Sequence, residues 1–371
     1  MAYMDPNVTN LSVSKTVENN ETTPTEVVIV CSLIFILIGV IGIGGNLLVI
    51  ISVMCNKKMR TSMTNLLITN LALADLIIMI FGIPEIIEFM KNNGWTMNLL
   101  ACKINRYILV SALYGSILTL LALSVERYIA IIHPIKAHIF CNKRRLAVVL
   151  GCIWPFAWIA GLPTLLFNKL DQSGPDQRLK YCMLQFPGNH LDVFLVFKYV
   201  ESLLFYYIPL VLQITLYCRI SRHLFIGTDR LYRIVHTRDL NGMPAERFSE
   251  ALQARRGVVK MLILSVFVYL FSYSPHQFLL IWNTFAPKTF HENWTYLVFT
   301  MIIAYVNSAA NPVLYSIFSQ NFRQCYKQFA FCAIGMRKEE SKARSRPPST
   351  NIHGSPKLWR HMSTATASTN V

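Results

Sequence analysis

The chain of 371 residues is 53% hydrophobic and only 15% charged, and its mean hydropathy of +0.41 is positive. Soluble domains carry about 25% charged residues, so this composition excludes an ordinary soluble domain and indicates burial in lipid. The formal net charge of +16 gathers beside apolar segments, where it marks the cytoplasmic side of a membrane, so it does not indicate a nucleic-acid-binding protein.

Seven apolar runs recur along the chain, and each is long enough to cross a hydrocarbon core of about 30 Å as a helix. They lie at 27–54, 66–90, 100–132, 146–167, 191–220, 258–285 and 294–318. We therefore expect an all-α membrane protein whose residues 27–318 form a seven-transmembrane helix bundle.

The stretch 1–26 before the first run is polar and contains three N-glycosylation sequons, at Asn7, Asn10 and Asn20. A fourth sequon, at Asn293, lies between the last two runs. Lysine and arginine gather in the alternate connections and in the C-terminal tail, which the positive-inside rule assigns to the cytoplasm. We expect a multi-pass plasma-membrane protein with a disordered, glycosylated extracellular arm and a cytoplasmic C-terminus.

Of the nine cysteines, only Cys102 and Cys182 fall on the predicted extracellular side. Disulfides form on that oxidising side, so these two residues are the simplest pair. Two free thiols are the alternative.

Polar and helix-bending residues interrupt the apolar runs. Asp75 stands within the second run, where a carboxylate costs about 2.5–3.5 kcal/mol to insert, so we expect it to face the bundle interior and to carry function. Proline removes a helical hydrogen bond and bends a helix, and five of the runs contain proline. The expected bends are at Pro84, Pro163, Pro209, Pro275 and Pro312.

Beyond the seventh run, aromatic and basic residues alternate at helical spacing over 319–332. This pattern predicts a short amphipathic helix on the inner leaflet, and Cys332 at its end is a candidate for palmitoylation. The tail 333–371 is rich in serine, threonine, proline and arginine and should be disordered. Its last residues, Thr369 to Val371, fit a PDZ-binding terminus.

Short motifs follow one another along the runs in a fixed order. They are Asn46, Asp75, Glu126-Arg127-Tyr128, Trp154, Pro209, Pro275 and Asn311-Pro312-x-x-Tyr315. Together they resemble the rhodopsin-like (class A) G-protein-coupled receptors, and the resemblance covers about 27–332. Within that class, the stretch 126–137 is similar to the neuropeptide receptors for thyrotropin-releasing hormone, neuromedin U and the pyrokinins.

The resemblance implies a neuropeptide receptor, not an enzyme, that activates a heterotrimeric G protein of the Gq class when its sixth helix moves. In the resting state Arg127 would pair with Glu126, and on activation it would turn toward Tyr217 and Tyr315. The residues of this switch are Glu126, Arg127, Tyr128, Tyr217, Asn311, Pro312 and Tyr315. Receptor kinases and arrestin would then act on the hydroxyl-rich tail.

The resemblance also implies that polar groups converge on Asp75. The set is Asn46, Asp75, Ser116, Asn307, Ser308 and Asn311. Such an oxygen-rich cage suits an allosteric Na⁺, and a water-filled hydrogen-bond network without an ion is the alternative. No other cofactor is expected.

The chain departs from the family pattern at two places, in the ligand pocket and at the toggle, the sixth-helix residues whose movement accompanies activation. Tyrosines replace the usual aromatic residues beside the sixth-helix proline, which makes Tyr269, Tyr273 and Pro275 the expected toggle. Leu109 stands where amine receptors have an aspartate, which argues against a monoamine. Separated polar residues suit an extended peptide, and a charge at the lipid interface or an internal ion pair is the alternative for each. The expected pocket contains Glu85, Glu88, Arg106, Leu109, Lys198, Glu201, His276 and Gln277.

Two other classes remain open. A class A receptor for a lipid or a small polar ligand would share these motifs. A membrane transporter would have as many spans, but transporters usually contain internal repeats, and the seven runs each carry a different motif.

Overall fold

The computed structural model describes residues 25–91, 94–135, 137, 143–172, 180–188, 190–227, 245–285 and 294–333. The predicted glycosylation sites Asn7, Asn10, Asn20 and Asn293 lie outside this part of the chain, as does the terminus from Thr369 to Val371. The helix that contains Cys332 is described, but the side chain of that cysteine is not.

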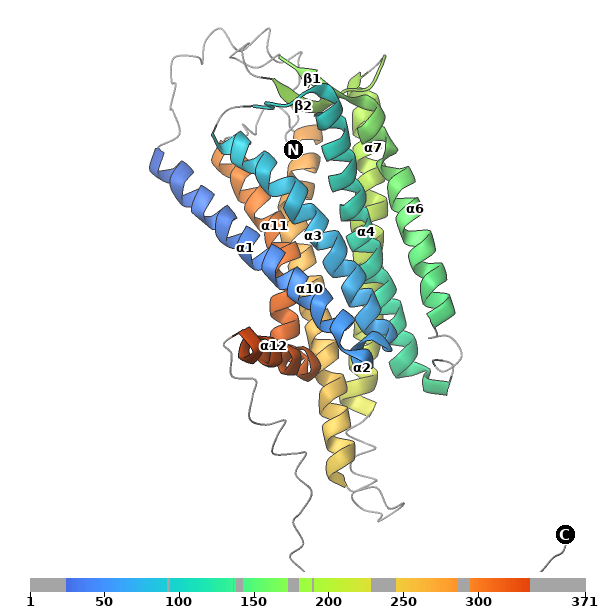
Figure 1. The fold of residues 1–371 in the computed structure, drawn as a ribbon. Coiled ribbons are helices and arrows are strands. Elements are labelled where there is room, and N and C mark those ends of the chain that lie inside the picture. The colour runs from blue at the N-terminus through green and yellow to red at the C-terminus, as the bar shows by residue number, and fades with distance from the viewer. Residues whose placement is uncertain are drawn as a thin grey trace, which may run out of the picture. The chain divides into compact units, whose positions relative to one another are not determined.

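Within the described residues, seven helical segments are long and apolar enough to cross a membrane, which confirms the predicted seven-helix architecture. Six are α1 (Thr25–Cys55), α3 (Met63–Met90), α4 (Leu99–Ile132), α6 (Lys143–Phe167), α10 (Ala245–Phe285) and α11 (Trp294–Phe318). The remaining one joins α7 (His190–Ser202), η2 (Leu203–Tyr207), α8 (Ile208–Ser221) and η3 (Arg222–Gly227). Figure 1 shows these segments running along one another.

Two short helices lie beside the spanning segments. The single turn α2 (Lys57–Arg60) follows α1, and Asn56 caps it by accepting hydrogen bonds from the backbone N–H groups of Lys58 and Met59. The helix α12 (Gln320–Ala333) begins where the amphipathic pattern predicted a helix. The aromatic ring of Phe322 in α12 is buried, stacked on the ring of Tyr315 in α11.

A two-stranded hairpin was not predicted. Strand β1 (Asn168–Asp171) pairs antiparallel with β2 (Tyr181–Leu184), and Leu170 lies opposite Cys182. Cys182 forms a disulfide with Cys102 at the start of α4, with Cα atoms 5.8 Å apart, which confirms the predicted pair. Figure 1 places the hairpin at one end of the bundle and α2 at the other, and we name these the hairpin end and the α2 end.

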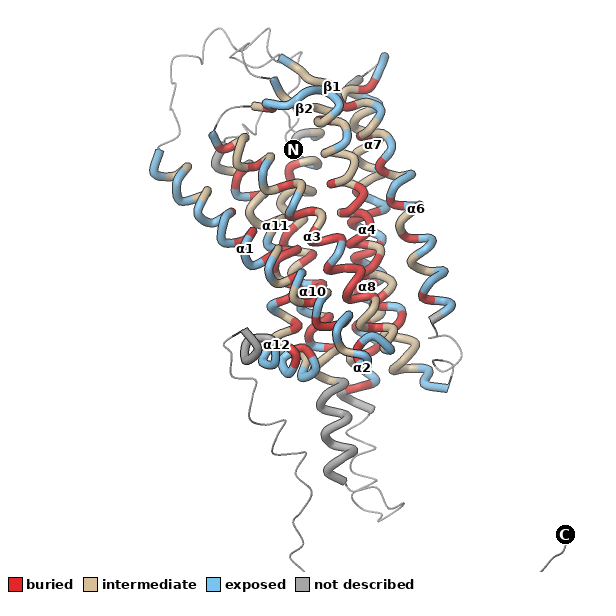
Figure 2. The backbone as a smooth tube through the Cα atoms, viewed as in Figure 1, coloured by how far each residue is buried: buried red, intermediate tan, exposed pale blue. Residues whose placement is uncertain are grey.

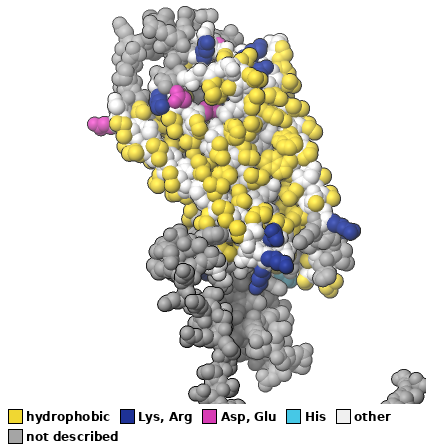
Figure 3. Space-filling model, viewed as in Figure 1, with side chains coloured by type: hydrophobic (Ala, Val, Ile, Leu, Met, Phe, Trp, Pro, Cys, Tyr) yellow, Lys and Arg dark blue, Asp and Glu magenta, His cyan; other side chains and the backbone are white. Residues whose placement is uncertain are grey.

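The core lies along α3 and α4. Their most apolar windows are 61% and 56% buried, whereas those of α1 and α6 are only 22% buried, so α1 and α6 present most of their apolar surface to the surroundings. Figure 2 shows the buried residues concentrated along the middle of α3 and α4. In Figure 3 apolar side chains cover the flank of the bundle, and lysine and arginine appear toward its ends. This distribution fits a bundle that crosses a membrane.

Two helices differ from their predicted bounds for identifiable reasons. Helix α10 starts at Ala245, because an apolar run marks only the lipid-embedded part of a helix that continues through polar residues. The predicted run 191–220 contains a π-helical segment, Leu203–Tyr207, directly before Pro209. Proline has no N–H for the carbonyl four residues earlier, and an α-helix accommodates that loss by widening or bending.

Candidate functional site

An ion pair occupies the α2 end of α4. The guanidinium of Arg127 donates from Nε to Oε2 of Glu126 and from Nη2 to Oε1, both at 2.6 Å. The hydroxyl of Thr64 on α3 contacts both members: it donates to Glu126 and accepts from Arg127. Glu126 is buried and the Arg127 side chain is only 20% exposed. Separating the pair would leave the buried Glu126 carboxylate without its counter-charge, so the arginine is released at low cost only when another group compensates that charge.

Among the described residues, no hydrogen bond joins Arg127 to either of the phenols predicted to receive it. Tyr217 on α8 and Tyr315 on α11 are both buried. Within the described part of the chain, the Tyr315 hydroxyl has no hydrogen-bond partner. The third motif residue, Tyr128, has its ring edge-on to His133 at 5.8 Å. The arrangement is thus the one in which the arginine is bound to its neighbouring acid.

Asp75 stands at the centre of the polar core and is fully buried. Its Oδ1 accepts a hydrogen bond from Ser116 Oγ at 3.1 Å, and its Oδ2 accepts one from Asn311 Nδ2 at 2.8 Å. The structure therefore brings α3, α4 and α11 together around one carboxylate. Pro312, next to Asn311, packs on α1 at Gly45, where a Cβ would lie 2.7 Å from the proline Cβ.

The remaining members of the predicted cage, Asn46, Asn307 and Ser308, are buried as well. Asn46 donates from Nδ2 to the carbonyls of Gly42, at 2.8 Å, and Ser308, at 3.1 Å. Its Oδ1 is buried and has no hydrogen-bond partner among the described residues. The side chains of Asn307 and Ser308 are also buried. Asn46 thus reaches the backbone of α11 rather than Asp75 itself.

The predicted toggle contacts the π-helical segment. The Tyr269 hydroxyl donates to the carbonyl of Phe205 at 2.5 Å. The ring of Tyr273 lies 5.2 Å from that of Tyr269, between centroids. Pro275 lies inside α10, and its carbonyl accepts a hydrogen bond from Tyr296 on α11 at 3.1 Å. Sequence reasoning missed the partner of Tyr269, because a backbone carbonyl leaves no mark in a sequence.

The charged residues of the predicted pocket form internal ion pairs at the hairpin end. Glu85 on α3 pairs with Arg106 on α4, and Asn105 donates to the same carboxylate at 2.9 Å. Lys198 pairs with Glu201 one turn along α7, at 2.7 Å. Both pairs are largely buried, so a ligand that used one of these charges would first have to displace its present partner.

The other predicted pocket residues differ in how far they are buried. Glu88 pairs with Lys91 at 3.2 Å on a more exposed surface. Leu109 is buried, and His276 and Gln277 are partly buried on α10. The Gln277 Oε1 atom is buried, and no described residue forms a hydrogen bond with it. Gln277 therefore offers an acceptor that the pocket itself does not use.

Two further residues of this region were not predicted. The Tyr114 hydroxyl on α4 donates to Glu201 Oε1 at 2.6 Å, and its ring is stacked on that of Phe205. Gly82 on α3 leaves room for the Tyr305 hydroxyl, which lies where a Cβ at position 82 would be. A tyrosine in an apolar run and a glycine in a helix were the available signals, and both have many ordinary explanations.

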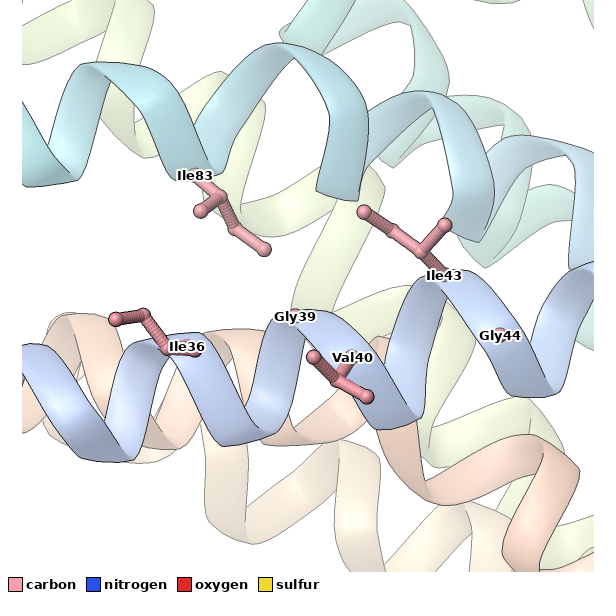
Figure 4. Close-up of a pocket in the computed structure, with 6 residues that line it drawn as sticks. All are labelled: Ile36, Gly39, Val40, Ile43, Gly44 and Ile83. Atoms are coloured by element: carbon pink, nitrogen blue, oxygen red, sulfur yellow. The ribbon is translucent and has the colours of Figure 1, made fainter.

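A shallow apolar groove of about 330 Å³ lies between α1 and α3. Ile36, Gly39, Val40, Ile43, Gly44 and Ile83 line it. Figure 4 shows Ile83 projecting from α3 toward α1 beside Gly39. Val40 at its rim is 67% exposed, and the lining offers no polar side chain, so the groove fits lipid rather than a water-soluble ligand.

Residues 45–315 match the family described as 7 transmembrane receptor (rhodopsin family). The chain is 31% identical to neuropeptide receptor 15 of Caenorhabditis elegans, over 82% of this chain and 91% of that protein. It is 30% identical to the thyrotropin-releasing hormone receptor of Gallus gallus, over 86% and 83%. It is 29% identical to the allatostatin-A receptor of Bombyx mori, over 88% and 87%. The chain therefore belongs to the rhodopsin (class A) family of seven-transmembrane receptors.

Proposed function

We propose that this receptor binds an extracellular peptide at the hairpin end and activates a heterotrimeric G protein at the α2 end. The Glu126–Arg127 pair carries the signalling part of the proposal, because it holds a partly buried guanidinium that a second conformation can release. The names of the relatives support the ligand class: they are receptors for thyrotropin-releasing hormone, for allatostatin-A and, more generally, for neuropeptides.

The pocket chemistry favours a peptide over the nearest rival, a lipid or a small polar ligand. Two buried ion pairs lie at the hairpin end, one between α3 and α4 and one on α7. Separated polar groups match the spaced side chains and backbone amides of a peptide, whereas a lipid would favour an apolar lining. Leu109, where amine receptors have aspartate, offers no counter-ion for a monoamine.

The membrane orientation and the coupling class belong to the same proposal. The disulfide-linked hairpin would be extracellular, because disulfides persist on the oxidising side, and the basic α2 end would be cytoplasmic. The glycosylated arm would then be outside, and α12, with palmitate on Cys332, would lie on the inner leaflet. Coupling to the Gq class rests on the sequence resemblance alone, as do phosphorylation, arrestin binding and PDZ binding of the tail.

An allosteric Na⁺ at Asp75 is a further part of the proposal. Three buried oxygens support it: the Asp75 carboxylate, the Ser116 hydroxyl bonded to it and the Asn46 Oδ1, with which no described residue forms a hydrogen bond; oxygens of this kind are the ligands that a hard cation takes. Asp75, Ser116, Asn46, Asn307, Ser308 and Asn311 would hold it. When bound, the ion would supply the positive charge that the buried carboxylate lacks and would stabilise the resting state.

A peptide screen tests the proposal directly. Cells that express the full chain are exposed to a library of amidated neuropeptides, and calcium release and a panel of Gα subunits report activation. We expect at least one peptide to activate the wild-type receptor and calcium release to reveal Gq coupling. Activation only by lipids or small polar metabolites would overturn the peptide assignment.

A further inference from the structure

The carbonyl of Phe205 is one of the points where α10 contacts the π-helical segment, and the hydroxyls of Tyr206 and Ser274, 2.8 Å apart, form another. In an α-helix this carbonyl would accept from the residue four positions on, but that residue is Pro209, which has no N–H. The hydroxyl of Tyr269 donates to it instead, at 2.5 Å. Both rings are buried, so water does not compete for the bond, and a buried carbonyl without any partner would be destabilising.

The ring of Phe205 continues the connection toward the pocket. It lies flat on the ring of Tyr114, with centroids 3.7 Å apart and planes only 9° from parallel. Tyr114 is also buried, and its hydroxyl donates to Glu201 Oε1 at 2.6 Å. One tyrosine on α4 thus contacts the π-helical segment with its face and α7 with its hydroxyl.

The connection ends at the hairpin end of α7. The second carboxylate oxygen of Glu201 accepts from Lys198 Nζ at 2.7 Å. The Lys198 and Glu201 side chains remain 22% and 18% exposed, unlike Tyr114, Phe205 and Tyr269, which are buried. The polar end of the connection is therefore accessible, and its other end is the toggle in α10.

From these contacts we propose that Glu201, Tyr114, Phe205 and Tyr269 form a transmission chain that reports a basic ligand group at Glu201 to α10. The proposal rests on the peptide-receptor function. A ligand amine or guanidinium takes the place of Lys198 and draws the Glu201 carboxylate away from Tyr114. The Tyr114 ring then shifts against Phe205, and the bond from Tyr269, which stabilises the resting position of α10, weakens.

The charge of the ligand group follows from the surroundings of Glu201. A ligand cation leaves the carboxylate compensated, whereas a ligand anion that removed Lys198 would leave a largely buried carboxylate without its partner. The displaced Lys198 ammonium can be stabilised in two ways. Its flexible side chain lets it reach water, and it already lies 5.6 Å from the ring centroid of Phe197, within range of a cation–π interaction. Exchange of one cation for another is the less costly event.

Ligand-free nucleotide exchange tests the chain without a known ligand. The full-length receptor in nanodiscs is mixed with purified heterotrimeric G protein, and GTPγS uptake is measured for Tyr114→Phe, Tyr269→Phe and the double variant. Each single change keeps the ring and removes one hydroxyl, and we expect each to raise basal exchange about two- to tenfold. Basal exchange in the double variant should be close to that of the more active single variant, because both changes interrupt the same transmission chain.

A matched pair shows that this coupling is specific. Tyr296→Phe removes the hydroxyl that bonds the Pro275 carbonyl, on α11 and outside the chain. In the double variant of Tyr296→Phe and Tyr114→Phe, the fold-change in basal exchange should equal the product of the two single fold-changes. The transmission chain is wrong if the effects of Tyr114→Phe and Tyr269→Phe multiply in the same way, or if either variant leaves basal exchange unchanged or lowers it.

The ligand charge is tested with a peptide that activates the receptor in the library screen. Each of its basic groups is replaced in turn by a neutral isostere, such as citrulline for arginine. Glu201→Gln retains an acceptor for Tyr114 but removes the charge. One replacement should lower potency about tenfold or more on the wild type and on the control Glu26→Gln, which changes an exposed acid of α1 outside the expected pocket, but little on Glu201→Gln.

The cation site would be refuted if each replacement lowered the potency of the peptide equally on the wild type and on Glu201→Gln. It would also be refuted if no replacement of a basic group lowered potency on the wild type. If no peptide activates the receptor, the proposed function fails, and the exchange measurements above still decide whether the transmission chain exists.

Discussion

The hydroxyl of Thr64 lies 3.2 and 3.3 Å from the two carboxylate oxygens of Glu126. It also accepts a hydrogen bond from Arg127, so a residue of α3 holds both members of the ion pair on α4. The pair is therefore tied to the bundle, and its strength depends on a side chain outside the Glu126-Arg127-Tyr128 motif.

Thr64→Val should weaken this resting contact. Valine has nearly the shape of threonine but can neither donate to Glu126 nor accept from Arg127. We expect ligand-free GTPγS uptake to rise several-fold at equal surface expression. Thr64→Ser retains the hydroxyl and should behave like the wild type, and unchanged uptake in Thr64→Val would show that the contact is incidental.

Removing the Asp75 charge should remove sensitivity to sodium. The thermal unfolding temperature of the purified receptor is compared in NaCl and in choline chloride at equal ionic strength. The wild type should unfold at a higher temperature in NaCl, because an ion that binds only the folded state stabilises it by mass action. Asp75→Asn should show no difference between the salts. A sodium effect that persists in Asp75→Asn would place the ion elsewhere or eliminate it.

The disulfide should behave as one structural unit. Cys102→Ala and Cys182→Ala each remove the link between α4 and β2, and loss of a disulfide typically costs about 2–4 kcal/mol. Surface expression and thermal stability should fall equally in either single variant and in the double variant. A double variant that is clearly worse than both singles would mean that each cysteine has a separate role.

Gly82 on α3 should not tolerate a larger residue, because Tyr305 on α11 packs against it. A methyl group there would collide with the Tyr305 hydroxyl, and we expect Gly82→Ala to lower stability by about 1–3 kcal/mol. Tyr305→Phe in the same chain should restore only part of it, because the ring carbons Cζ and Cε1 would still lie 2.7 and 2.8 Å from the added methyl. The control is Gly44→Ala, whose added methyl would meet no atom within 4 Å. Equal behaviour of the two alanine variants would contradict the packing assignment.

The sequence predicted the spanning helices because long runs of apolar residues mark them. It predicted the disulfide because the distribution of lysine and arginine identifies the extracellular side, where only Cys102 and Cys182 fall. It did not predict the hairpin, since Asn168–Asp171 and Tyr181–Leu184 are four-residue strands without a strong alternating pattern. It placed Glu85 and Arg106 in the pocket but did not pair them. Pairing depends on which helix faces meet, and one sequence does not contain that geometry.

Tyr114 shows the same limit at the level of a single residue. Its position in an apolar run is compatible with a lipid-facing or a core aromatic residue, and its hydrogen bond to Glu201 crosses from α4 to α7. The only sequence signal near this contact is Pro209, four residues after Phe205. That signal predicts a carbonyl in need of a donor but does not identify Tyr269 as the donor.

Nucleotide exchange on a heterotrimeric G protein measures whether Arg127 transmits activation. Uptake of GTPγS by a purified heterotrimer is recorded with the wild-type receptor, with Arg127→Gln and with the control Arg60→Gln, which changes an exposed arginine at the same end of the bundle. With an activating peptide present, Arg127→Gln should lose nearly all exchange at normal peptide binding, while Arg60→Gln should resemble the wild type. Undiminished exchange in Arg127→Gln would show that Arg127 does not transmit activation.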